Sequence, residues 1–246
     1  MRLFVWPVDA ARALARAWAP AQVERVEGAP HEALAALLRG EVDLALVPTL
    51  DALRAADDLA LVPGVGLVGG SSPAARLVVG GALDALQTVA FDPRLAQEAL
   101  LTQVVLREHY DARPSFLPAD PAASLADLLT RADAALVRPD RVGETDGALV
   151  LDLGQEWLDL TARPMVWGLV AARAGALGAK EARALRAAAR RAVPPTEGAF
   201  VLDGYALGGL DAFADYLYAH GSLDDLPELP FVEHGEEAPE DDALDA

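Results

Sequence analysis

Residues 30–50, PHEALAALLRGEVDLALVPTL, decide the fold class because they contain a complete helix, strand and turn. The segment begins with a proline, and Gly40 follows its alanine- and leucine-rich part. Proline at the start of a helix and glycine just past its end are the usual boundary residues. Residues 42–47 are then almost entirely apolar, as expected of a buried strand. Pro48 makes a turn, and Thr49 can cap a short following helix.

The same alternation of helix-like and strand-like segments continues on both sides of this stretch. Residues 3–6 read as the first strand, and Asp9 can cap the helix that follows it. Further strands are expected at 59–62, 75–79, 89–91, 134–137, 148–151 and 165–171, and further helices at 95–110, 125–129 and 179–193. This alternation is typical of an α/β protein with largely parallel strands.

Composition limits the classes of function. The chain has 246 residues, enough for two lobes of roughly 100 residues each, and it has no cysteine, which excludes disulfides and thiolate chemistry. Its net charge of -18 argues against nucleic acid and against anionic membrane surfaces. The N-terminal apolar run is too short for a signal peptide, and no stretch approaches the ~18 apolar residues of a membrane span. We therefore expect a soluble, cytoplasmic protein, and composition leaves its oligomeric state open.

Several short motifs are set aside. Gly64-x-Gly66-x-x-Gly69 has the dinucleotide-binding spacing, but a strand pattern follows it where that site needs a helix, so we expect a glycine-rich loop between strands. The four histidines lack a partner at metal-ligand spacing: His31, His109, His220 and His234. The serine nucleophile motif Gly-x-Ser-x-Gly is absent. The sequence therefore predicts no metal and no cofactor, and it singles out no catalytic residue.

Four segments together resemble the menaquinone-biosynthesis family that contains chorismate dehydratase and dihydroxynaphthoate synthase. Residues 43–49, DLALVPT, are similar to the family's DVALVPS, and residues 132–140, ADAALVRPD, to its ADAALLIGD. Residues 152–167, DLGQEWLDLTARPMVW, are similar to DLGxxWxxxTGLPFVFA, the most specific of the four. Residues 213–231, FADYLYAHGSLDDLPELPF, resemble the closing helix and its proline-bearing exit. The resemblance spans nearly the whole chain in the family's order.

The resemblance implies a two-lobed periplasmic-binding-protein type II-like fold, with a ligand cleft between the lobes. We expect residues 1–82 and 168–232 to form lobe one, residues 83–167 to form lobe two, and residues 233–246 to be a disordered acidic tail. The glycine pair at 80–81 suits a hinge between the lobes.

The sequence departs from the family where the family's polar pocket residues are expected. Asp9 stands where the family has an asparagine, Pro139 where it has a glycine, and residues 95–98, LAQE, where it has SRTS. Chorismate is a dianion, so a pocket for it needs oriented donors or cations. The candidate substrate-binding residues are Asp9, Thr49, Arg76, Arg94, Arg138 and Trp167. The arginines can instead be ordinary solvated side chains.

Two functions stay open. The first is a chorismate-dehydratase-like carbon–oxygen lyase that binds a small anionic carboxylate, with its activity in doubt because the pocket motifs are substituted. The second is a non-catalytic relative that keeps the closing fold as a small-molecule binder or sensor. Resemblance over the full length favours the lyase, and the loss of the SRTS-like segment favours the binder.

Overall fold

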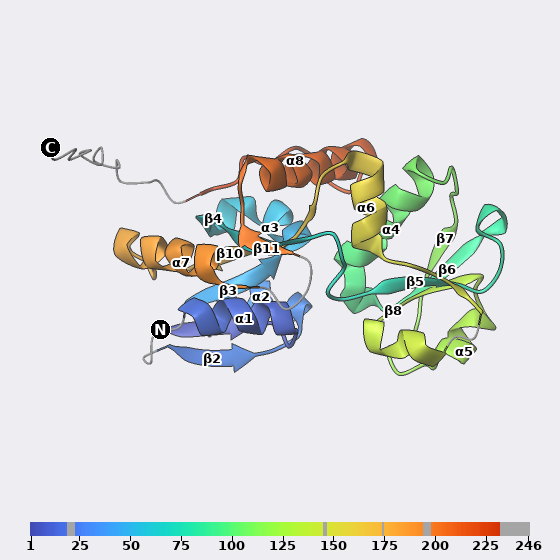
Figure 1. Cartoon of the computed structure of the whole chain (residues 1–246), viewed down its shortest axis with the longest axis horizontal. Helices are drawn as coiled ribbons and strands as arrows, with labels where there is room; N and C mark the ends of the chain where they lie inside the picture. Colours follow the sequence, from blue (N-terminus) through green and yellow to red (C-terminus); the bar gives the residue numbers. More distant parts are fainter. Residues whose placement is uncertain (19–22, 145–146, 174, 194–197, 232–246) are drawn as a thin grey trace, which may run out of the picture.

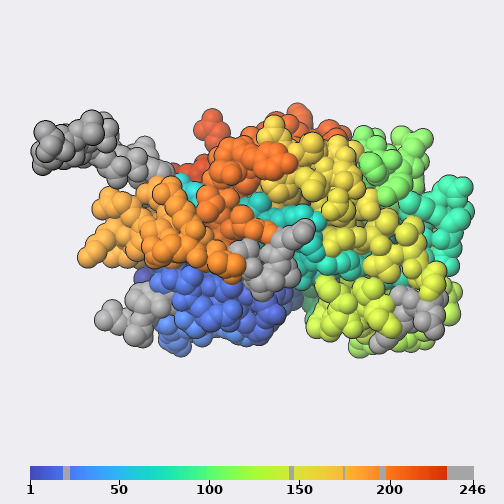
Figure 2. Space-filling model, viewed as in Figure 1, coloured from blue at the N-terminus to red at the C-terminus, as the bar shows by residue number. Residues whose placement is uncertain are grey.

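A computed structural model of the chain describes residues 1–18, 23–144, 147–173, 175–193 and 198–231. These residues form two separate β-sheets, each accompanied by its own helices, which lie side by side along the long axis of the molecule (Figure 1). In the space-filling view, the N-terminal residues in blue lie in the left-hand part and the residues in green in the right-hand part (Figure 2). The acidic segment 233–246, expected to be a disordered tail, lies outside the described residues.

The first sheet has six strands in the order β11-β4-β10-β3-β1-β2. Their bounds are β1 (Arg2–Val5), β2 (Glu24–Glu27), β3 (Leu44–Pro48), β4 (Ala60–Gly69), β10 (Met165–Ala172) and β11 (Ala199–Val201). The helices of this part are α1 (Asp9–Trp18), α2 (Ala33–Leu38), α3 (Thr49–Arg54), α7 (Ala179–Arg191) and α8 (Gly204–Ala219), with short 3-10 turns η1 (Pro30–Glu32) and η2 (Ala56–Asp58). Strands β3 and β10 are buried along their whole length, so the centre of the sheet is core.

The second sheet has five strands in the order β7-β6-β8-β5-β9. Their bounds are β5 (Arg76–Val79), β6 (Thr88–Phe91), β7 (Ser115–Pro118), β8 (Ala134–Val137) and β9 (Leu149–Leu151). This part also holds α4 (Ala96–Glu108), α5 (Leu125–Leu129) and α6 (Leu153–Thr161), and the 3-10 turns η3 (Leu83–Ala85), η4 (Pro93–Leu95) and η5 (Pro139–Glu144).

The prediction of largely parallel strands holds for only part of each sheet. Strands β2 and β3 run parallel to β1, and β7 and β8 run parallel to β6. Strands β4, β10 and β11 make antiparallel pairs in the first sheet, and β5 is antiparallel to both of its neighbours in the second. The helix–strand pattern could not reveal this, because strand direction there depends on where the chain crosses from one sheet to the other.

The chain crosses between the sheets twice. It leaves the first sheet after Gly69 and enters the second at Arg76, then leaves the second after Leu151 and returns at Met165. Both changes come before the boundaries expected at 82 and 168. The glycine pair at 80–81 follows β5 within the second sheet, where the Gly80 amide donates to a backbone carbonyl next to β8. The division of the chain into lobes by residue range stays a prediction, with both crossings earlier than expected.

One carboxylate joins the two crossings. Asp152 caps α6 by accepting from the amide of Gly154 at 2.9 Å. It also accepts from the Ser71 hydroxyl at 2.7 Å and the Ser72 amide at 2.8 Å, which lie on the outward crossing. Arg76 completes the set with an ion pair at 2.8 Å. Asp152 therefore fixes the outward crossing to the beginning of the return crossing.

We expect Asp152→Ala to lower the free energy of unfolding by about 2 kcal/mol, because it removes a helix cap and leaves a partly buried arginine unpaired. Chemical denaturation measures the change. Asp159→Ala, on the exposed side of the same helix, is the matched control and should stay within about 0.5 kcal/mol of the parent. Equal stability of the two variants would contradict the role given to Asp152.

The glycine motif at 64–69 lies inside strand β4, which corrects the expected loop. Gly64 has φ +74 where the register of β4 against β10 shifts, a conformation that favours glycine. A Cβ on Gly66 would lie 2.8 Å from the carbonyl oxygen of Gly168, so close strand packing requires this glycine too. The motif is a bulged strand, and its spacing has a structural cause.

Candidate functional site

The largest described cavity is a cleft of about 760 Å³ bordered by segments of both parts of the molecule. Its walls come mainly from the connections after β1, β2 and β3 in the first sheet, and after β6 and β8 in the second. These connections follow the carboxyl ends of the parallel strands, where α/β proteins bind ligands. The lining residues are Trp6, Pro7, Val8, Asp9, Ala29, Pro30, His31, Pro48, Leu50, Asp51, Pro73, Ala74, Asp92, Pro93, Arg94, Leu95, Ala96, Gln97, Glu98, Arg138, Pro139 and Asp140.

Three of the six predicted site residues line this cleft: Asp9, Arg94 and Arg138. Each arginine is held by an aspartate two positions away. Arg94 pairs with Asp92 at 2.6 Å, and Arg138 pairs with Asp140 at 2.8 Å. Their positive charges are therefore largely balanced within the cleft wall, which weakens them as anchors for an anion. Asp9 is largely exposed at the start of α1.

The other three predicted residues, Thr49, Arg76 and Trp167, lie outside the lining of the cleft. The Thr49 hydroxyl is buried and donates to the carbonyl of Val166 at 2.6 Å. The buried Trp167 indole donates to the carbonyl of Gly69 at 3.2 Å. Arg76 is engaged by Asp152. All three hold the framework behind the cleft.

Gln97 connects the second part of the molecule to this framework. Its side-chain oxygen accepts from the amide of Leu50 at 2.9 Å, and its side-chain nitrogen donates to the carbonyl of Trp167 at 3.0 Å. Both groups of the Gln97 amide are used, and the side chain is buried. The first turn of α4 is thereby fixed against α3 and β10.

The next residue along the chain, Glu98, is the least expected group in the cleft wall. Its side chain is only 7% exposed, yet it lines the cleft. Burial raises the pKa of its carboxyl to about 7, while its own backbone amide opposes the shift and the charge of Asp51 adds to it. Within the described residues, no other group donates a hydrogen bond to this carboxyl or forms an ion pair with it.

Two further titratable residues face the same space from the first part of the molecule. Asp51 lies in the first turn of α3 and His31 lies in η1. Burial raises the pKa of the Asp51 carboxyl, and the charges of Arg54 and His31 act in the opposite direction. The cleft thus brings two carboxyl groups with raised pKa values together with an imidazole, a combination that is concentrated at functional sites.

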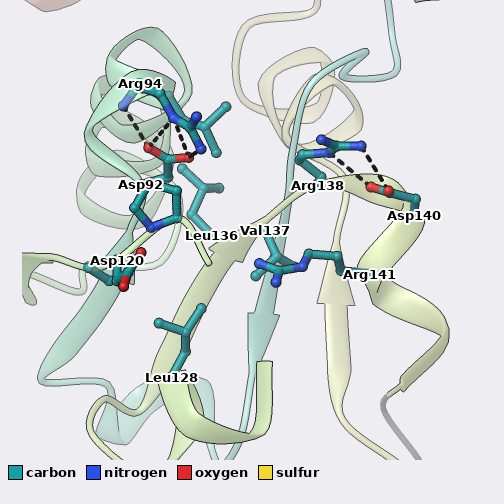
Figure 3. Close-up of a pocket in the computed structure, with 12 residues that line it drawn as sticks. Asp92, Arg94, Asp120, Leu128, Leu136, Val137, Arg138, Asp140 and Arg141 are labelled. Atoms are coloured by element: carbon teal, nitrogen blue, oxygen red, sulfur yellow. Dashed lines mark hydrogen bonds and ion pairs between the residues drawn. The ribbon is translucent and has the colours of Figure 1, made fainter. Parts of the chain in front are cut away.

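A second, smaller cavity of about 210 Å³ opens beside the cleft, and five residues line both. Figure 3 shows its ion pairs, Arg94 with Asp92 and Arg138 with Asp140, and shows Arg141 extending from η5 toward the middle of the pocket. No ion pair or side-chain hydrogen bond joins the Arg141 guanidinium to another described residue. It is the guanidinium of this pocket that is available to a ligand.

Neither a metal site nor a membrane span is found in the described part of the chain. No group of three or more histidine, aspartate and glutamate side chains there could hold a metal ion. No helix there is long and apolar enough to cross a membrane.

A family model described as menaquinone biosynthesis matches residues 7–198, which include all the residues that line the cleft except Trp6. The chain belongs to this menaquinone-biosynthesis family. The membership inferred from the four sequence segments is therefore confirmed.

Solved structures show the fold of this member of the menaquinone-biosynthesis family at low sequence identity. A protein from Archaeoglobus fulgidus aligns with a TM-score of 0.64 and 16% identity over 90% of this chain and 98% of its own. The ligand-binding component of an ABC-type import system from Staphylococcus aureus aligns with a TM-score of 0.65 and 15% identity, over 95% of this chain and 96% of its own. The periplasmic aliphatic sulphonate binding protein from Escherichia coli aligns with a TM-score of 0.59 and 16% identity, over 93% of this chain and 94% of its own. These likenesses confirm the predicted two-lobed fold of the periplasmic-binding type.

Sequence reasoning missed His31, Asp51, Glu98 and Arg141. Glu98 belongs to the segment that replaces the family's SRTS, and the sequence interpretation noted only that the hydroxyl groups of that segment are missing. Arg141 could have been found, because it lies three positions after Arg138 in the connection that follows β8. His31 and Asp51 carry no local signal, since only the packing of α3 and η1 against the cleft gives them a role.

Proposed function

We propose that this member of the menaquinone-biosynthesis family is a chorismate-dehydratase-like lyase, which binds a small carboxylate in the cleft and removes water from it. Family membership over residues 7–198 and a cleft of about 760 Å³ support this proposal. A cytoplasmic location and the absence of a cofactor stay predictions.

The observation that carries the proposal is the position of the first turn of α4. Residues 95–98 line the cleft, and the first backbone amides of a helix have no acceptor within the helix. The Leu95 amide donates to the carbonyl of Asp92 and the Glu98 amide to its own carboxyl, which leaves the amides of Ala96 and Gln97 for a ligand. Together with the helix dipole they favour an anionic group at this end. This is the segment where the family has SRTS. Backbone amides can replace the lost hydroxyls as donors to a carboxylate.

Arg141 offers a second contact of the right charge. A guanidinium can hold a carboxylate through two hydrogen bonds, and the Arg141 pocket shares part of its lining with the cleft. A dianion such as chorismate has two carboxylates to place. We assign one to the first turn of α4 and the other to Arg141.

The non-catalytic alternative rests on a specific observation as well. Arg94 and Arg138 are balanced by their own aspartates, and the hydroxyl-bearing segment is absent. A protein of this kind would bind a small molecule and release it unchanged. Binding and turnover must therefore be measured separately.

The test adds chorismate to the purified protein and follows the loss of its absorbance together with its dissociation constant by calorimetry. We expect binding and turnover. Arg141→Ala should weaken binding about 10-fold, because it removes a charge-assisted contact. Arg113→Ala is the matched control, since Arg113 is 70% exposed and lies outside the lining of both cavities.

Each outcome separates the two functions. Binding without turnover would leave the non-catalytic binder. Failure to bind chorismate would remove this substrate from both functions. Equal affinity of the Arg141 and Arg113 variants would show that the second carboxylate lies elsewhere in the cleft.

A further inference from the structure

We propose that Glu98 is the proton-transfer residue of the cleft, where it gives a proton to the hydroxyl group that a bound small carboxylate loses as water. The inference rests on the proposed lyase function and assigns its acid. Residues 95–98 lack the hydroxyl groups of the family's SRTS segment, but they contain the carboxylic acid of Glu98 in their place.

Glu98 differs from its neighbour in how the fold uses it. Both polar groups of the Gln97 side chain form hydrogen bonds with backbone groups, one in α3 and one in β10. The Glu98 carboxyl lies against the cleft with its own amide as its nearest polar support. A buried carboxyl supported only by its own amide is poorly compensated for the loss of water, and a group of this kind in a cleft wall calls for a functional explanation.

A second buried glutamate shows the structural alternative. Glu156 in α6 is as deeply buried as Glu98, at 9% exposure, but its carboxylate accepts from the Tyr110 hydroxyl at 2.5 Å. It lies outside the lining of the cleft. Among the described residues, the glutamate of the frame therefore has a side-chain partner, whereas Glu98, which lines the cleft, has only its own backbone amide.

The charged groups around Glu98 decide whether it holds its proton. Asp51 faces the cleft from α3, His31 from η1, and Asp9 from α1. From the second part of the molecule come Asp92 with Arg94 and Arg138 with Asp140, and both arginines are already paired. Burial disfavours the charged form of Glu98 and the charge of Asp51 adds to this effect, so the pKa of the Glu98 carboxyl is raised to about 7 and a substantial fraction of it holds its proton near neutral pH.

In the proposed elimination, Asp51 acts as the base and Glu98 acts as the acid. Asp51, as the carboxylate, takes the proton from a carbon next to the hydroxyl-bearing carbon. The electrons of that C–H bond form a carbon–carbon double bond, the C–O bond breaks, and Glu98 gives its proton to the leaving oxygen. One water and one alkene are formed. Exchange with solvent then removes the proton from Asp51 and returns one to Glu98.

The experiment compares Glu98→Gln with Glu156→Gln, which changes a glutamate of similar burial away from the cleft. We expect Glu98→Gln to keep the dissociation constant of chorismate within about 3-fold and to lose at least ~100-fold in turnover, the usual contribution of a general acid. Glu98→Asp should recover part of the loss, and Glu156→Gln should keep its turnover. Wild-type turnover should fall as the pH rises through about 7.

A direct titration keeps this inference separate from the identity of the substrate. Carbon-13 NMR of labelled glutamate carboxyls, assigned by the Glu98 variant, should show Glu98 changing charge near neutral pH and shifting when benzoate occupies the cleft. If the wild type does not turn over chorismate, the lyase proposal fails for this substrate while such a titration would still support Glu98. Titration in the ordinary acidic range, or full turnover by Glu98→Gln, overturns the assignment.

Discussion

Replacing Glu98 by glutamine is expected to raise the free energy of unfolding by about 3 kcal/mol at about pH 8, and to leave it nearly unchanged at about pH 4. Burial raises the pKa of the carboxyl from 4.5 to about 7. In the unfolded chain the carboxyl ionises near its ordinary pKa. In the folded chain it must be ionised in a buried site at high pH. Glutamine has almost the same shape as glutamic acid and carries no ionisable group, so this unfavourable ionisation does not occur in the variant.

The sign follows from the raised pKa. Below the unfolded pKa both states hold the proton, so Glu98 costs nothing. As the pH rises from about 4.5 to about 7, the unfolded state releases its proton first and the folded state loses relative stability. Denaturation of the parent and of Glu98→Gln across this range measures the widening difference. Glu228→Gln, at an exposed position, is the control variant in the same measurement. A constant difference between the parent and Glu98→Gln would contradict the raised pKa.

The stability and activity predictions for Glu98 have opposite signs. The same substitution should make the chain more stable at neutral pH and remove most of its turnover. A residue kept only for packing would not behave in this way, because its removal would destabilise the fold. Function is the reason why a protein retains an unfavourable buried group.

The fold could be predicted because its signals are local. Residues 30–50 predicted a helix, a strand and a turn, and the structure has α2, β3 and α3 there. Membership of the family followed from short segments in order. Strand direction and the positions of the crossings could not be read in this way. The ten residues of β4 carry three glycines, a loop-like composition, and their extended form depends on pairing with β10 and β11.

The candidate site was less accessible to sequence reasoning, for a physical reason. Arg94 and Arg138 were predicted as cations that attract an anionic substrate, but the sequence did not show that the aspartates two residues away form ion pairs with them. Glu98 and Asp51 are far apart in sequence and gain their raised pKa values only from burial in the folded chain. A residue type alone does not show whether a carboxyl has a partner. The packing around a carboxyl determines whether it has a hydrogen-bond or ion-pair partner.

Two adjacent glycines in α8 should respond in opposite directions to the same substitution. A Cβ on Gly209 would lie 2.1 Å from the carbonyl oxygen of Pro164, which belongs to the backbone just before β10. Either the helix or the strand would have to move, so we expect Gly209→Ala to lower the free energy of unfolding by about 3 kcal/mol, at the upper end for overpacked sites. The return crossing between the sheets would be displaced with it.

Gly208→Ala is the matched control for Gly209→Ala. Its Cβ would meet the guanidinium of Arg163 at 2.9 Å, and the end of this side chain can move away over the Tyr205 ring that it contacts. Alanine also favours a helix over glycine by about 1 kcal/mol. We therefore expect Gly208→Ala to be neutral or up to about 1 kcal/mol more stable. Thermal and chemical denaturation of both variants measure the difference. A Gly209 variant as stable as the Gly208 variant would show that α8 is free to shift away from the return crossing.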